Sequence, residues 1–175
     1  MCFFRRQPPR PAFPEPEASN SVDRALDLEP VALILVTGVV EGWVLRQERR
    51  LSESLNAGEV LHVKLATETG EPGAWADYLP EDVMAVAASP RRHPSPRRVS
   101  RRRQEMTFVT KEYRLSGTAH IPIGADPDRY TASALQRWLP LTQCTVTTGQ
   151  DSWRIDVLLV NLDRVDRVRE TDPGE

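Results

Sequence analysis

Short apolar segments, separated by charged or Gly- and Pro-containing turns, follow one another along the chain after residue 30. Segments 39–45, 60–67, 114–123 and 139–147 are rich in β-branched and aromatic residues, with partial alternation of apolar and polar positions. This pattern is typical of half-buried strands. The sequence therefore predicts a mainly β protein with short helices, built from small curved antiparallel sheets or barrels.

A short helix is predicted between strands in each half of the chain. In the second half, Asp126 is a suitable N-cap, Pro127 suits the first helical position, and Asp128 favours the positive end of the helix dipole. In the first half, segment 49–56 is the counterpart, and it ends at the stop signal Asn56-Ala57-Gly58.

The two halves present their features in the same order. Four pairs of corresponding residues are Gly42 and Gly117 (75 positions apart), Arg50 and Arg129 (79), Gly70 and Gly149 (79), and Val83 and Val165 (82). The small drift in spacing is what loop insertions cause. We therefore expect an internal duplication, with a first β unit over residues 31–88 and a second over residues 105–170, packed as a pseudo-symmetric pair. One fused sheet and two separate barrels both fit the pattern.

Between the two units, residues 89–104 carry seven arginines, three prolines and no acidic residue, in a chain whose net charge is −2. Proline removes backbone donors and the arginines repel one another, so we expect an extended basic linker. The first unit carries a net charge of −5. Residues 1–30 and 171–175 are predicted to be disordered tails.

The basic linker is the most specific candidate for binding an anionic partner. Its arginines are Arg91, Arg92, Arg97, Arg98, Arg101, Arg102 and Arg103. Guanidinium groups at this density neutralise phosphates in a salt-sensitive way that does not depend on base sequence. No aromatic residue is interleaved to stack on bases, as single-strand binders require. The alternative is a segment that stays solvated or docks on the acidic units beside it.

The N-terminal tail offers a second, weaker candidate. Phe3, Phe4 and Phe13 could form a short docking motif or a weak contact with a membrane surface, but a solvated tail is the favoured interpretation. The start of the chain lacks the basic-then-apolar order of a signal peptide, and no apolar run approaches the ~20 residues of a membrane-spanning helix. We expect a cytoplasmic protein.

No pattern indicates catalysis, a metal or a cofactor. Cys2 and Cys144 form no CxxC pair, and the histidines His62 and His120 have no second ligand nearby in the sequence. The acidic clusters Glu81-Asp82 and Asp163/Asp166 fit exposed turns as well as acid–base chemistry. Four tryptophans could line a groove, but core positions are the usual place for them: Trp43, Trp75, Trp138 and Trp153.

The stretch Arg50-Leu51-Ser52-Glu53-Ser54-Leu55-Asn56 and the closing segment 158–165 carry a family resemblance. The chain resembles small uncharacterised bacterial β-domains built around an Arg-Leu-Ser-Asp-x-Leu-Asn stretch, with Glu53 in place of the Asp. Both units follow the order of features, and the second departs further at Tyr130, Thr131 and Ala132. More remotely, the pattern is similar to Sm-like barrels, whose RNA-contacting Asp and Asn pattern is not found here.

These observations favour a non-enzymatic interaction or scaffold protein. Its partner is expected to be another protein or a second copy of the chain, because units of this size bury little core alone. The alternative is a nucleic-acid-associated protein that contacts phosphates through Arg91 to Arg103.

Overall fold

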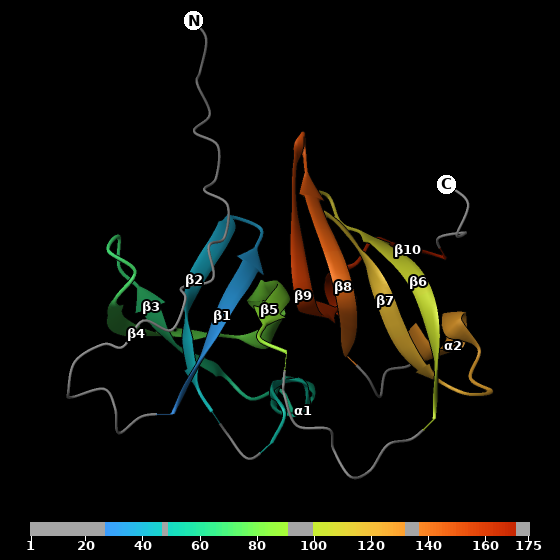
Figure 1. The fold of residues 1–175 in the computed structure, drawn as a ribbon, viewed down its shortest axis with the longest axis horizontal. Helices are drawn as coiled ribbons and strands as arrows, with labels where there is room; N and C mark the ends of the chain where they lie inside the picture. The colour runs from blue at the N-terminus through green and yellow to red at the C-terminus, as the bar shows by residue number, and fades with distance from the viewer. Residues whose placement is uncertain (1–26, 47–48, 91–99, 132–136, 171–175) are drawn as a thin grey trace, which may run out of the picture.

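The computed structural model describes residues 27–46, 49–90, 100–131 and 137–170, and they form one antiparallel sheet of ten strands (Figure 1). The strands of the first half are β1 (Leu28–Leu35), β2 (Gly38–Leu45), β3 (Leu61–Ala66), β4 (Pro72–Tyr78) and β5 (Val83–Ala88). Those of the second half are β6 (Arg101–Val109), β7 (Arg114–Pro122), β8 (Trp138–Thr148), β9 (Asp151–Asn161) and β10 (Arg167–Glu170). The mainly β fold class predicted from the sequence is confirmed.

The short helices lie where the sequence predicts them. Helix α1 (Leu51–Asn56) connects β2 to β3, and helix α2 (Pro127–Thr131) connects β7 to β8. At the start of α2 the carboxylate of Asp126 accepts a hydrogen bond from the Arg129 N–H at 3.1 Å, as an N-cap does. Single 3₁₀ turns, η2 (Pro80–Asp82) and η3 (Leu162–Arg164), precede the last strand of each half.

Strand order is the same in the two halves. Along the sheet it runs β5-β1-β2-β3-β4 in the first half and β10-β6-β7-β8-β9 in the second, so that in each half the fifth strand lies beside the first. The glycines in the second strands face the third strands closely. A Cβ on Gly42 would overlap the Lys64 carbonyl, and one on Gly117 would crowd Cys144 and Thr142. Both glycines thus permit the close backbone approach that their positions in strands suggest.

The halves are joined by β5 and β9, which pair antiparallel from Ala85↔Val160 to Ala88↔Val157. In Figure 1 these strands lie at the centre, between the first half on the left and the second on the right. A closed five-stranded barrel would need β5 to pair with β4. Because β5 pairs with β9 instead, the expected barrels are not closed, and the described strands form one open sheet.

Two strands depart from the sequence-based expectations. No strand is predicted for the apolar run Val31–Val36, but most of it lies in β1, which begins at Leu28 and is buried over Val31–Ile34. Strand β6 begins at Arg101, so the last arginines of the predicted linker belong to regular structure. Arg91, Arg92, Arg97 and Arg98 lie outside the described residues, as do the N-terminal phenylalanines.

Side chains on opposite faces of β1 and β5 pack into two separate hydrophobic cores. Val31 and Leu33 of β1 pack into a core formed mainly by the first half, whereas Ala32 and Ile34 pack into a core formed mainly by the second. Trp138 of β8 is fully buried in the core of the first half. Burial on both faces explains why residues 31–35 of β1 and all of β5 are apolar instead of alternating.

Two asparagine side chains form hydrogen bonds between the two halves, beside the central strands. Asn161, at the end of β9, is fully buried and donates to the carbonyls of Pro80 (3.0 Å) and Val83 (2.9 Å). Asn56, at the end of α1, accepts from the Trp138 N–H (2.8 Å) and donates to the Trp138 carbonyl (3.3 Å). Each side chain thus hydrogen-bonds backbone groups of the other half.

We expect Asn161→Ala to lower the free energy of unfolding by about 2–4 kcal/mol, because it leaves two buried carbonyls without their donor. Chemical denaturation measures the change. Ser152→Ala, at an exposed position of the same strand, is the control and should stay within about 0.5 kcal/mol of wild type. Equal losses in the two variants would contradict the role assigned to Asn161.

Candidate functional site

The two ends of the sheet are its most distinctive surface. Strand β4 pairs only with β3, and β10 pairs only with β6, so no described residue pairs with the outer side of either strand. Large apolar side chains are exposed there: Trp75 (43% exposed) and Leu79 (48%) at the β4 edge, and Val168 (37%) on β10. An edge strand with free backbone groups and exposed apolar side chains is a template for adding another strand.

The two edge strands are the counterparts of the two strands that join the halves, because their residues pair in the same register within each half. Leu33 pairs with Val86 in the first half, and Phe108 pairs with Val168 in the second. Leu61 pairs with Tyr78, and Leu139 pairs with Val160. Strand β10 therefore has the place in the second half that β5 has in the first, and β4 has the place of β9.

The β4 edge is acidic, whereas the middle of β10 is basic. Strand β10 carries the exposed Arg167 and Arg169, with Asp166 just before the strand and Glu170 at its end. Strand β4 carries the exposed Asp77, whose carboxylate lies 2.7 Å from the ring nitrogen Nδ1 of His62. Glu71 and Glu81 lie just beyond the two ends of the strand. A basic edge and an acidic edge attract one another and help to select the partner.

Of the predicted anion-binding arginines, the structure describes Arg101, Arg102 and Arg103, and all three are exposed on β6. The Arg101 guanidinium donates to the His120 carbonyl of β7 at 3.4 Å. Burial lowers the pKa of His120, and the charges of Arg103 and Arg101 lower it further. The beginning of β6 is therefore a positively charged patch on regular structure.

The other candidates from the sequence do not come together as a site. Trp138 and Trp153 lie in different cores, Trp43 is half-buried, and Trp75 is at the β4 edge. Asp163 pairs with Arg137, and Asp82 lies 4.0 Å from Arg164. Burial raises the pKa of the Cys144 thiol to about 12, so it stays protonated at neutral pH and is a poor nucleophile.

Within the described part of the chain, no group of three or more His, Cys, Asp or Glu side chains could hold a metal ion. None of the helices there is long and apolar enough to cross a membrane. No known family model, curated protein or solved structure matches the chain. Its function is therefore inferred from its own geometry.

The lowered pKa of His120 predicts a pH dependence of stability. Below its ordinary pKa of 6.5 the unfolded chain takes up a proton that the folded protein resists, so stability falls as the pH drops through 6.5. We expect His120→Gln to lose less stability than wild type between neutral pH and pH values below 6.5. Thermal unfolding at several pH values measures this loss of stability. The control is His62→Gln, which keeps His120 and should therefore lose as much stability at low pH as wild type. Parallel pH profiles for wild type and His120→Gln would contradict it.

Proposed function

We propose that the protein is a non-enzymatic scaffold, built from two duplicated β units, which assembles with further copies of itself through the β4 and β10 edges. The observation that carries this proposal is the pairing of β5 with β9 inside the chain. It joins β5, the fifth strand of the first unit, to β9, the fourth strand of the second. The fourth strand of the first unit, β4, and the fifth strand of the second, β10, remain at the ends of the sheet.

The duplication itself is supported by register as well as by sequence. Val31 pairs with Gly42 in the first half, and Met106 pairs with Gly117 in the second, so both members of the pair are shifted by 75 positions. The 3₁₀ turns Pro80–Asp82 and Leu162–Arg164 are shifted by 82 positions, as are Val83 and Val165. Corresponding positions thus share secondary structure and pairing partners.

If a second copy repeats the internal joint, the pairing between chains has a definite register. Each residue of β5 corresponds to the residue of β10 that lies 82 positions later, and each residue of β9 corresponds to the residue of β4 that lies 82 positions earlier. Replacing the residues of the β5–β9 ladder by these counterparts gives the contact between β10 of one copy and β4 of the next. The expected pairs are Arg167↔Tyr78, Val168↔Asp77, Arg169↔Ala76 and Glu170↔Trp75.

In this register Val168 lies opposite Asp77 and Glu170 lies opposite Trp75 on one face of the sheet. Arg167 and Arg169 lie on the other face, close to the acidic edge as a whole but not paired with Asp77. The contact covers Val168 and Trp75. It is heterologous, because different surfaces of the two copies meet. Such contacts close into a ring when the rotation between copies permits, and they otherwise extend into a filament. The scaffold would therefore be an extended or closed array of β units in one continuous sheet.

We expect the wild-type protein to form concentration-dependent oligomers, and Arg167→Glu/Arg169→Glu to be monomeric because the β10 edge then repels the acidic β4 edge. Size-exclusion chromatography with light scattering measures both. The matched control, Arg114→Glu/Arg154→Glu, makes the same charge change at exposed positions of inner strands. A wild-type protein that stays monomeric up to millimolar concentration, or a control as defective as the edge variant, would refute self-assembly through the edges.

A second candidate function, contact with nucleic-acid phosphates, is favoured by the three adjacent exposed arginines of β6. Burial lowers the pKa of His120, and the positive charges of Arg103 and Arg101 lower it further. Counterion release makes such binding weaken steeply as salt is raised.

If this second function holds, labelled duplex DNA and single-stranded RNA should bind at low salt, and Arg101→Ser/Arg102→Ser/Arg103→Ser should weaken binding and flatten its salt dependence. A filter-binding or anisotropy titration at several salt concentrations gives both quantities. No binding at low salt, or an unchanged salt slope in the triple variant, would exclude the candidate.

A further inference from the structure

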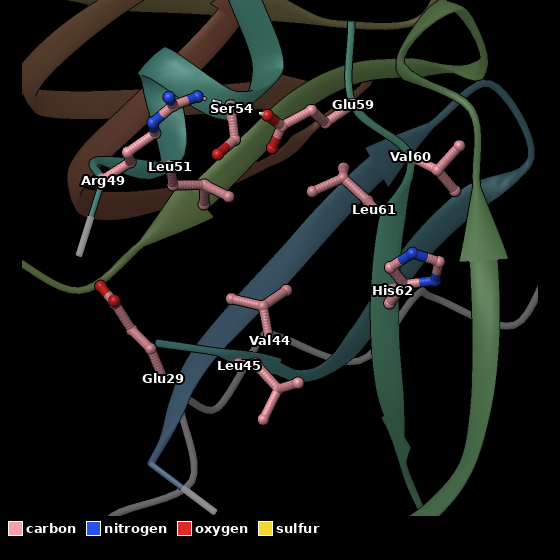
Figure 2. Close-up of a pocket in the computed structure, with 10 residues that line it drawn as sticks. All are labelled: Glu29, Val44, Leu45, Arg49, Leu51, Ser54, Glu59, Val60, Leu61 and His62. Atoms are coloured by element: carbon pink, nitrogen blue, oxygen red, sulfur yellow. Dashed lines mark ion pairs between the residues drawn. The ribbon is translucent and has the colours of Figure 1, made fainter. Parts of the chain in front are cut away.

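A small pocket opens in the first half, where the start of β1, the end of β2, helix α1 and the start of β3 meet (Figure 2). Its cavity volume is about 70 Å³. The apolar part of the wall is formed by Val44, Leu45, Leu51, Val60 and Leu61, and the other lining residues are Glu29, Arg49, Ser54, Glu59 and His62. Leu45 and Val60 are also partly exposed, which gives the pocket an apolar rim at the surface.

Glu29 of β1 lines this pocket and is only 6% exposed. Among the residues that the structure describes, no hydrogen bond or ion pair reaches its carboxylate. The nearby cation, Arg49, pairs with Glu59 at 3.7 Å (Figure 2). The Glu29 carboxylate oxygens keep some exposure, so the group is open to the pocket and attracts a cation that enters it.

We propose that the pocket binds an organic cation, an alkylammonium or alkylguanidinium group, with the charged end at Glu29 and the alkyl stem along the apolar wall. A cation satisfies the buried carboxylate through a charge-assisted hydrogen bond. An alkyl stem removes the wall from water, as the methylene chains of Lys and Arg do on protein surfaces. A metal ion would not fit the site, because Glu59 is paired with Arg49 and half of the lining residues are apolar, which leaves too few free oxygen ligands.

The size of the pocket limits the ligand. A volume of about 70 Å³ is that of roughly two water molecules, so it encloses the charged end and the first carbons while the rest of the ligand extends past Leu45 and Val60. The same group can come from a free amine or from a Lys or Arg side chain of a protein partner. Both sources present one cation on a flexible apolar stem.

The test uses the full chain and four probes in nuclear magnetic resonance titrations: n-butylammonium, N-butylguanidinium, the neutral 1-butanol, and N-acetyl-lysine N-methylamide. We expect the cationic probes to shift amide signals of β1, α1 and β3, and 1-butanol to bind about tenfold more weakly, the factor for losing one hydrogen bond to a charged group. Tighter binding of the blocked lysine than of n-butylammonium indicates a protein partner, and the reverse order indicates a small amine.

Glu29→Gln keeps the shape of the side chain and removes its charge. We expect it to weaken binding of the cationic probes about tenfold. Its melting temperature should stay close to that of wild type, because the side chain keeps its shape and no described ion pair is lost. Glu71→Gln is the matched control, with the same charge change at an exposed position outside the pocket. If Glu29→Gln does not fold, the proposal is tested by the difference in affinity of the wild-type protein for the cationic probes and for 1-butanol.

Failure of the cations to bind wild type would overturn the proposal, as would equal binding of n-butylammonium and 1-butanol or equal affinities of Glu29→Gln and Glu71→Gln. The result is independent of the scaffold function. The edge variant Arg167→Glu/Arg169→Glu should bind the probes as wild type does, whether or not wild type assembles.

Discussion

The pairing of β5 with β9 is the interaction on which the rest of the architecture depends. It makes one sheet from two five-stranded halves, and it lets β1 and β5 contribute side chains to two cores at once. Asn161 hydrogen-bonds the backbone just before and at the start of β5, and Asn56 reaches Trp138 from α1. Without this ladder each half would keep an open strand at both ends and a smaller core.

The sequence predicts the local elements well, because each is encoded by neighbouring residues. The Asp126-Pro127-Asp128 signal marks the start of α2, and the Asn56-Ala57-Gly58 stop marks the end of α1. The strands around Gly42 and Gly117 follow from β-branched residues with partial alternation. Strand β1 escapes this reasoning because it is buried on both faces, and a continuous apolar run does not reveal its own state.

Pairings between distant strands could not be predicted from these signals. The residues of β5 do not indicate whether their partner is β4, which would close a barrel, or β9, which joins the halves. The pocket of Glu29 is equally hidden in the sequence, because Glu29 precedes Pro30 in a region that resembles a solvated tail. Its burial depends on Val44, Leu51 and Leu61, which come from three later elements.

The contrast between corresponding strands explains how one geometry can serve two kinds of contact. Strand β5 is Val-Met-Ala-Val-Ala-Ala, buried throughout, whereas the described side chains of β10, Arg167 to Arg169, are exposed. Residues 158–160 of β9 are buried, whereas Trp75 and Asp77 of β4 are exposed. An apolar ladder inside the chain is permanent, because opening it would expose both cores to water. The charged ladder proposed between copies would gain less from burial and more from electrostatics, so it would form selectively and respond to concentration and salt.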